Sequence, residues 1–229
     1  MNLISRLTIQ KVLASPRQNI IYLASDGTRD YVIKAARQNS LALLEAYEDE
    51  YETLKQISHP VLPHYFSMIP DFRINSESIP VPALCMEYIK GTPFLSIDYL
   101  TTKQLKKYIL DLGDGLLLLL SKGVLYTDLH PGNLLLSDSQ IKLLDFTCAY
   151  YFLKNPYPSY VPKISYHLNQ NLKGQQLLVQ ALSFLLIHLP DRFSIQGIPD
   201  FLLEMGQNPH NGLLFSDFLK ELDREWKTD

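Results

Sequence analysis

A short polar segment near the middle of the chain contains residue types that bind metal ions. Asn133 precedes the apolar run 134–136, and Asp145 follows the β-type run 141–144. If these runs pair as an antiparallel hairpin, Asn133 and Asp145 lie at the same end of it. Mg²⁺ takes a few amide or carboxylate oxygens from a protein and completes its shell with phosphates and water. The spacing therefore predicts a magnesium site formed by Asn133 and Asp145.

A further acidic group, Asp128, lies just upstream of Asn133 in the loop 126–133, whose sequence is YTDLHPGN. The Pro-Gly pair of this loop predicts a turn. Asp and Asn are also common turn residues, so each of these side chains taken singly could serve only the turn. The segment as a whole nevertheless concentrates three polar groups suited to chemistry on phosphate.

A second candidate pair lies nearer the N-terminus. Glu50 falls on the apolar stripe of a helical pattern, because the residues three and four positions away on either side are mostly apolar. Charged side chains are seldom buried unless they are paired, and Lys34 on the preceding β-type run is the natural partner. The alternative is a Glu at the edge of the stripe that reaches solvent.

The elements expected to position these residues fall into two parts. The first third of the chain alternates β-type runs with turns, with Asp26-Gly27 as a hairpin signal, and the apolar period becomes helical from Ser40 to Ile57. The expected strands cover residues 7–13, 20–24, 31–35, 62–69 and 83–89.

Lys90-Gly91-Thr92-Pro93 is expected to be a linker, and beyond it the pattern is mainly helical, over 102–122 and 174–188. The hairpin described above lies between these helices, with its turn at 137–140. This order predicts an α+β chain with a small antiparallel sheet and one helix over 1–89, a linker over 90–93 and a mainly helical part over 94–229.

Composition excludes several classes. The formal charge is −3 with no basic block, which argues against a nucleic-acid partner. The apolar runs 116–120 and 177–189 are too short for membrane spans, and the N-terminus does not resemble a secretion signal. Cys85 and Cys148 are expected to be reduced core thiols, and the scattered histidines predict no zinc site. We therefore expect a cytoplasmic protein.

The order of these residues along the chain resembles that of the protein kinase family, from about Leu7 to Leu189. The resemblance implies a two-lobed fold whose cleft binds ATP and Mg²⁺. It implies that Lys34 holds the α- and β-phosphates, that Glu50 pairs with Lys34, and that Asp128 is the catalytic base. Asn133 and Asp145 would hold the metal ions.

The same resemblance implies the contacts of the adenine ring. Met86-Glu87-Tyr88 is similar to the hinge, whose backbone meets the adenine edge. The ring itself would lie between three apolar side chains, which are Ile21, Val32 and Leu135.

The chain departs from the family pattern at several places. The phosphate-covering loop, residues 14–19, contains no glycine, and we expect Arg17 to supply a side-chain contact to phosphate instead. Thr127 replaces the arginine before the catalytic aspartate, and Thr147 replaces a glycine two residues after Asp145. No Ala-Pro-Glu anchor follows, and the usual peptide-binding helices are expected to be shortened or missing.

These departures leave three hypotheses. The first is an active kinase acting on Ser or Thr of a protein, and the second is a pseudokinase that binds a regulatory partner. The third is a small-molecule kinase, because the loop around His130 is also similar to that of aminoglycoside and choline phosphotransferases. The aromatic segment 148–173 is a candidate docking surface for a protein partner or, alternatively, a loop that packs on its own lobe.

Overall fold

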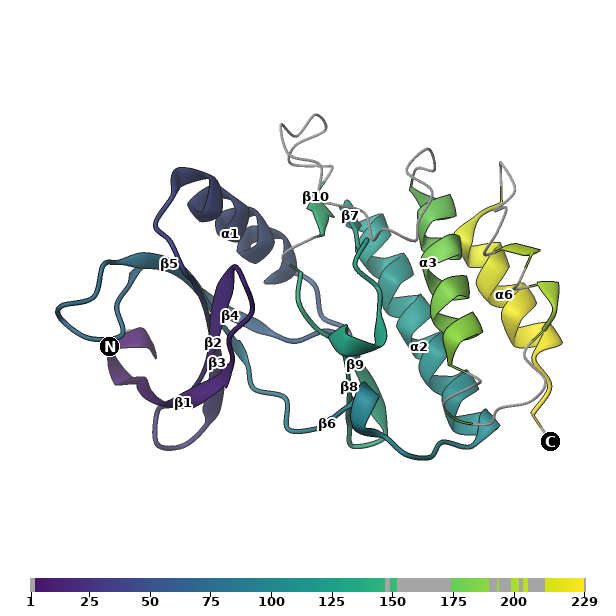
Figure 1. The fold of residues 1–229 in the computed structure, drawn as a ribbon. Helices are drawn as coiled ribbons and strands as arrows, with labels where there is room; N and C mark the ends of the chain where they lie inside the picture. Colours follow the sequence, from purple (N-terminus) through teal and green to yellow (C-terminus); the bar gives the residue numbers. More distant parts are fainter. Residues whose placement is uncertain are drawn as a thin grey trace. The chain divides into compact units, whose positions relative to one another are not determined.

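The computed structural model describes residues 3–146, 149–151, 174–189, 193, 199–201, 204–205 and 213–228. The chain forms two compact units, one from Met1–Ser58 and Pro63–Lys90, the other from His59–Leu62 and Gly91–Asp229 (Figure 1). The first unit contains an antiparallel sheet and one α-helix, whereas the second unit is built mainly on α-helices with short strands between them. The expected α+β class is confirmed.

The sheet of the first unit has five antiparallel strands in the order β1-β2-β3-β5-β4. The 3₁₀ helix η1 (Leu3–Arg6) precedes it. The strands are β1 (Thr8–Ala14), β2 (Asn19–Ser25), β3 (Asp30–Ala36), β4 (Tyr65–Phe72) and β5 (Val81–Glu87). The turn between β2 and β3 is stabilised by Asp26, whose carboxylate accepts bonds from Thr28, Arg29 and Tyr31.

The two faces of this sheet have different surroundings. Tyr31, Ile33 and Ala35 of β3 belong to a core that is covered by η1 and the start of β1. Successive side chains of a strand point to opposite faces, so Lys34 lies on the other face. On that face the sheet contacts helix α1 through the bonds between Lys34 and Glu50.

Helix α1 (Leu41–Leu54) begins where the sequence places it. Ser40 is the N-cap and accepts a hydrogen bond from the Leu43 backbone at 3.2 Å. The helix buries three residues, spaced three and four apart, namely Tyr47, Glu50 and Leu54. The helix therefore presents Glu50 to the interior of the unit, as the apolar period indicated.

The expected strand 62–69 begins three residues too early. Val61 and Leu62 belong to the second unit, where the Val61 carbonyl accepts a bond from Leu143 N at 2.8 Å. Strand β4 begins only at Tyr65. The apolar run is thus shared between two cores, which a local pattern does not distinguish.

The second unit is built on α2 (Thr102–Ser121), α3 (Gln175–His188) and α6 (Phe215–Glu225). A capping box between Thr101 and Gln104 opens α2. Helix α6 was not predicted from the sequence. Its buried residues follow a helical period of three and four, and it packs on α2 at Gly113, where a Cβ would overlap Leu219.

The expected hairpin is present as β8 (Leu134–Ser137) and β9 (Gln140–Leu143). Its turn lies at the predicted residues 137–140: Ser137 pairs with Gln140, and Asp138 and Ser139 lie between them at φ 47° and 60°. The other short elements are β6 (Thr92–Pro93), η2 (Phe94–Ser96), β7 (Val124–Leu125), η3 (Pro131–Asn133) and β10 (Tyr150–Tyr151).

Strand β10 pairs with β7. Of the aromatic segment 148–173, the structure describes only residues 149–151. Cys148 and the preceding Thr147 lie outside the described residues. Within the part of the chain that the structure describes, no helix has the length and apolar character needed to cross a membrane.

Candidate functional site

Lys34 and Glu50 form a buried ion pair in the first unit. Lys34 Nζ lies 3.0 Å from each carboxylate oxygen of Glu50, and the two residues are only 3% and 2% exposed. The pairing inferred from the apolar stripe is therefore present, and Glu50 does not reach solvent. Contact with both carboxylate oxygens fixes the position of the ammonium on the α1 side of the sheet.

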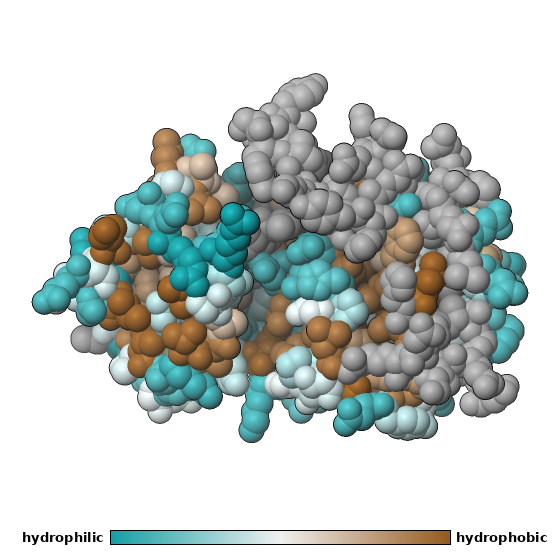
Figure 2. Space-filling model, in the orientation of Figure 1, coloured by the Kyte–Doolittle hydropathy of each residue, from teal (hydrophilic) through white to brown (hydrophobic). Residues whose placement is uncertain are grey.

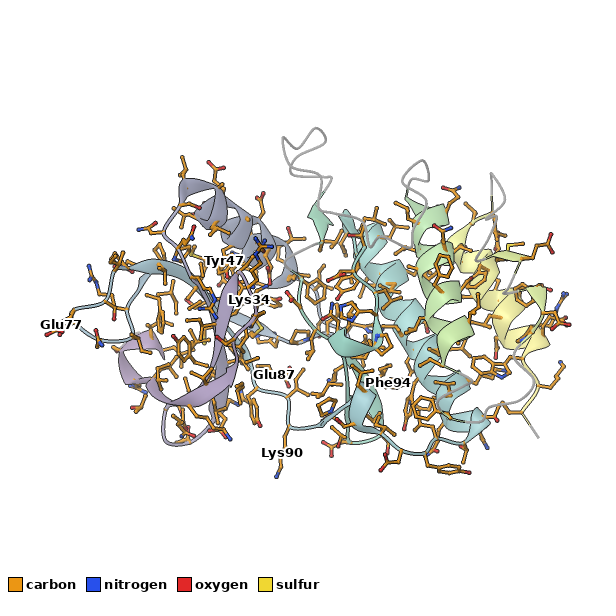
Figure 3. The ribbon with its side chains drawn as sticks, in the orientation of Figure 1. Lys34, Tyr47, Glu77, Glu87, Lys90 and Phe94 are labelled. Atoms are coloured by element: carbon orange, nitrogen blue, oxygen red, sulfur yellow. The ribbon has the colours of Figure 1, made fainter. Side chains whose placement is uncertain are left out.

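Three further polar side chains surround this pair, and none of them was predicted from the sequence. The Tyr65 hydroxyl donates to Glu50 Oε1 at 2.8 Å. The Tyr47 ring lies 5.6 Å from Lys34 Nζ, and the Tyr47 hydroxyl donates to the side-chain oxygen of Asn19. Figure 3 shows Lys34 and Tyr47 close together, one on the sheet and one on α1. The ion pair thus belongs to a cluster of five buried side chains.

The expected adenine-binding residues of the first unit share the face of Lys34. In the strand register Ile21 lies opposite Lys34, and Val32 lies opposite Met86. Ile21, Val32 and Met86 are each half-buried, whereas the core residues on the other face of the sheet are buried. The Glu87 N–H donates to the His64 carbonyl at 2.8 Å, so this N–H already has a hydrogen-bond acceptor within the first unit. Tyr88 follows it and is half-buried.

The glycine-free loop between β1 and β2 is held by an arginine. Arg37 Nε donates to the Pro16 carbonyl at 2.9 Å, and its Nη2 donates to the Ser15 carbonyl at 3.2 Å. The Arg37 backbone N–H donates to the Gln18 carbonyl at 3.0 Å. Arg17, at the tip, is exposed, and hydrophilic residues cover the tip of this hairpin on the face shown in Figure 2. The loop is therefore tied to the end of β3.

In the second unit Asp128 and Asn133 lie together. Asn133 Nδ2 lies 3.0 Å from the Asp128 carbonyl and 3.3 Å from Asp128 Oδ2. The backbone carbonyl of Asn133 also accepts a bond from Leu144 N at 2.8 Å. This bond continues the β8–β9 ladder and places Asn133 and Asp145 at the same end of the hairpin, as antiparallel pairing predicts.

His130 is a neighbour of Asp128 whose contacts were not predicted from the sequence. Its Nδ1 accepts a bond from Gly132 N at 3.0 Å, and its Nε2 lies 3.7 Å from Asp128 Oδ2. The nearby Asp128 carboxylate raises the pKa of His130. A Cβ at residue 132 would lie 2.9 Å from the His130 ring, so the glycine permits this orientation.

Asp145 adopts a left-handed backbone conformation, with φ 56°, and its side chain is exposed. Such a conformation is uncommon for a residue other than glycine and is often found at functional sites. Tyr126 contacts both chain neighbours of Asp145, Leu144 and Phe146. The Tyr126 hydroxyl donates to the Leu144 carbonyl at 2.7 Å, and its ring packs edge-on against Phe146 at 5.2 Å.

Among the described residues there is no cluster of three or more His, Cys, Asp or Glu that could hold a metal ion by itself. The magnesium site expected from Asn133 and Asp145 therefore stays a prediction, in which phosphates and water would complete the shell of the metal ion. Leu135, the remaining adenine candidate, lies half-buried on β8, and a Cβ on Gly91 would lie 3.0 Å from its side chain.

A five-stranded antiparallel sheet with a buried Lys–Glu pair, and a mainly helical unit with an Asp–Asn loop, define a protein-kinase-like chain. Comparison with known families agrees, because the family described as protein kinase domain matches residues 21–181. The chain therefore belongs to the protein kinase domain family. The glycine-free loop precedes the matched residues.

Three curated proteins are similar to this chain. Serine/threonine-protein kinase UCN of Arabidopsis thaliana is 25% identical over a 203-residue alignment that covers 77% of this chain and 48% of that protein. Serine/threonine-protein kinase PknG of Mycobacterium leprae (strain TN) is 28% identical over a 135-residue alignment that covers 55% of this chain and 17% of that protein.

The third relative is the proto-oncogene serine/threonine-protein kinase mos of Sus scrofa, 38% identical over 60 residues, which are 26% of this chain and 17% of that protein. The matched parts of the three relatives thus cover less than half of each relative's length.

Proposed function

We propose that the chain is an ATP- and Mg²⁺-dependent phosphotransferase that acts on Ser or Thr of a protein. The observation that carries the proposal is the buried Lys34–Glu50 pair, at 3.0 Å on both oxygens. Burying two charges is costly, and an ion pair rarely stabilises a fold better than apolar side chains of the same volume. A role in binding phosphate explains why the chain keeps it.

In this proposal Lys34 binds the α- and β-phosphates of ATP, and Glu50 fixes the direction of its ammonium. Asp128 accepts the proton of the attacking hydroxyl and orients it. Ile21, Val32 and Leu135 contact the adenine ring, and the backbone of Met86-Glu87-Tyr88 meets its edge. Because the Glu87 N–H is used by His64, we assign the backbone donor for adenine to Tyr88.

The donor set of the second unit fits magnesium. The Asn133 amide nitrogen is directed at Asp128, so its amide oxygen is the atom that would bind a cation. Asp145 is exposed, and its backbone has the left-handed conformation, with φ 56°. Bound magnesium would neutralise charge on the transferred phosphate, and Asn133 and Asp145 would set its place.

A binding role without catalysis is the second candidate, favoured by the loop 15–18. Glycine-rich loops let backbone N–H groups approach phosphates closely, whereas this loop has side chains throughout, a proline, and carbonyls that accept bonds from Arg37. Arg17 is the residue proposed to contact phosphate from the tip of this loop.

A small-molecule acceptor is the third candidate, favoured by the loop around His130.

The proposal is tested with labelled ATP, Mg²⁺ and generic protein acceptors, using the wild-type chain and the Asp128→Asn and Asp145→Asn variants. Asp138→Asn is the matched control, since Asp138 also has a positive φ, at 47°, but lies in the hairpin turn. We expect label transfer by the wild type and by Asp138→Asn, and a loss of at least about a hundredfold in the other two variants.

Other outcomes select among the alternatives. Thermal stabilisation by ATP without transfer to proteins or to a panel of hydroxylated metabolites indicates a nucleotide-binding pseudokinase. Transfer to a metabolite alone indicates a small-molecule kinase. If ATP neither stabilises the chain nor labels an acceptor, the proposed function is wrong.

A further inference from the structure

We propose that Tyr65 and Tyr47 are positioning residues that hold the Lys34–Glu50 pair assembled before any nucleotide binds. The part of this inference that concerns ATP rests on the proposed function. The part that concerns the position of helix α1 does not, because it follows from contacts within the first unit.

Tyr65 fixes the carboxylate of Glu50 from the sheet. Glu50 lies on α1 and receives two bonds from Lys34 on β3, and a third from the Tyr65 hydroxyl on β4 at 2.8 Å. In the register Tyr65 lies opposite Met86, on the face that also carries Val32 and Lys34. Two strands therefore hold one carboxylate, and rotation of Glu50 away from Lys34 would also break its bond to Tyr65.

Tyr47 adds a third point of attachment, one turn earlier on the same face of α1. Its hydroxyl donates to Asn19 Oδ1 at the start of β2, and its ring faces the Lys34 ammonium at 5.6 Å. A cation over an aromatic ring is attracted by the ring's negative face. Helix α1 is thereby joined by side chains to β2, β3 and β4.

Burial makes these attachments act together. The five residues of the cluster are each no more than 3% exposed, so water cannot replace a bond that is lost. Moving α1 outward would leave the Glu50 carboxylate, the Tyr65 hydroxyl and the Asn19 amide without these partners in a region closed to solvent. We infer that α1 is docked in the resting protein and that Lys34 is preorganised for phosphate.

The test compares Tyr65→Phe and Tyr47→Phe, which remove only a hydroxyl, with the matched control Tyr51→Phe. Tyr51, like Tyr47, lies on α1. Its hydroxyl donates to the Phe66 carbonyl of β4 at 3.3 Å and not to Glu50. Hydrogen–deuterium exchange of residues 41–54 is measured without nucleotide. Dissociation constants for Mg-ATP and for adenosine are measured by calorimetry.

We expect Tyr65→Phe to weaken Mg-ATP binding roughly tenfold, since it removes a hydrogen bond to a charged group, and to leave adenosine binding within about twofold. Both Tyr65→Phe and Tyr47→Phe should increase exchange in α1, and Tyr51→Phe should change the nucleotide constants little. The ratio of the dissociation constants for Mg-ATP and adenosine separates positioning of Lys34 from general destabilisation, because adenosine has no phosphate that Lys34 could bind.

Equal weakening of ATP and adenosine by Tyr65→Phe would overturn the positioning role. Exchange in α1 that stays at the wild-type level in both variants would overturn the docking of the helix. If the wild type binds neither ligand, the proposed function fails, and the exchange measurement alone decides whether the tyrosines hold α1 in place.

Discussion

The two groups of candidate site residues are built in opposite ways. In the first unit Lys34 and Glu50 are enclosed, each no more than 3% exposed, and the charge of each is balanced by the other. In the second unit Asp128 is half-buried and Asp145 is exposed. The first group is positioned by packing and hydrogen bonds between side chains. In the second group Asn133 is buried and bonds Asp128, whereas Asp145 has an uncommon left-handed backbone conformation.

The two groups therefore differ in how far their charged side chains reach solvent. A buried ammonium is held in place by a carboxylate of the same unit and is therefore oriented whether or not a ligand is present. An exposed carboxylate in a left-handed conformation costs backbone energy and gains no burial in return. Binding of a cation by Asp145 stays a prediction of the proposed function.

The largest effect should come from breaking the enclosed pair. Lys34→Met removes the ammonium and leaves the buried Glu50 carboxylate with the bond from the Tyr65 hydroxyl. It should lower the free energy of unfolding by about 3–5 kcal/mol. Urea denaturation measures this loss. Asp145→Asn should change the free energy of unfolding little, because the carboxylate is exposed and Asn tolerates the left-handed conformation.

Two further variants control this comparison. Lys55→Met removes a half-buried ion pair with Glu52 at the end of the same helix, whose side chains are 33% and 45% exposed. It should cost far less, because solvent reaches and screens that pair. The double variant Lys34→Met/Glu50→Met should recover part of the loss, since no charge remains unpaired. A single Lys34→Met variant as stable as Lys55→Met would contradict the enclosed character of the pair.

The sequence predicted the elements that depend on local pattern. The apolar period placed Glu50 on the inner face of α1, and alternation placed Lys34 on β3. The Asn133–Asp145 arrangement followed from hairpin pairing alone. Helix α6 was missed although its buried residues Phe215, Phe218, Leu219 and Leu222 carry an equally local signal, so the sequence does contain the pattern that predicts it.

The contacts that complete the site could not be predicted in this way. Tyr65 and Glu50 are 15 residues apart, Tyr47 and Asn19 are 28 apart, and each pair joins a strand to a helix. Tyr is common in strands and on helix surfaces for packing reasons, so nothing local marks its hydroxyl as a partner of Glu50. The roles of the site residues in catalysis remain predictions.

A smaller effect should follow from loosening the backbone around Asp145. Tyr126→Phe keeps the ring on Phe146 but removes the bond to the Leu144 carbonyl, and should cost about 1 kcal/mol of stability. If this bond positions Asp145, the variant should also need a higher Mg²⁺ concentration for half-maximal label transfer. Titration of activity with Mg²⁺ at saturating ATP measures that requirement.

Tyr108→Phe is the control, because it removes a hydroxyl from another buried tyrosine of the same unit. It should leave the Mg²⁺ requirement at the wild-type value. An unchanged requirement in Tyr126→Phe would show that residues 144–146 keep their conformation without the hydroxyl, and that the position of Asp145 is set by the β8–β9 hairpin.

The smallest effect concerns the closed face of the first unit's sheet, opposite Lys34. Cys85 pairs with Ile33 in the register, belongs to the core beneath η1, and is fully buried. Burial raises the pKa of its thiol from the ordinary value of 9.0 to about 12. The reactive thiolate is therefore roughly a thousandfold rarer at neutral pH than for an exposed cysteine.

In a Cys148→Ser background, which leaves one thiol, Cys85 should react with a thiol reagent at pH 8 only after urea unfolds the chain. The raised pKa also sets the direction of a pH effect on stability. The folded state keeps its proton up to about pH 12, whereas the unfolded thiol loses its proton near pH 9, so the contribution is complete below pH 9 and is lost as the pH rises toward 12. Rapid reaction in the folded protein would mean that this face opens, and that the sheet is not the rigid support on which the positions of Lys34 and Tyr65 depend.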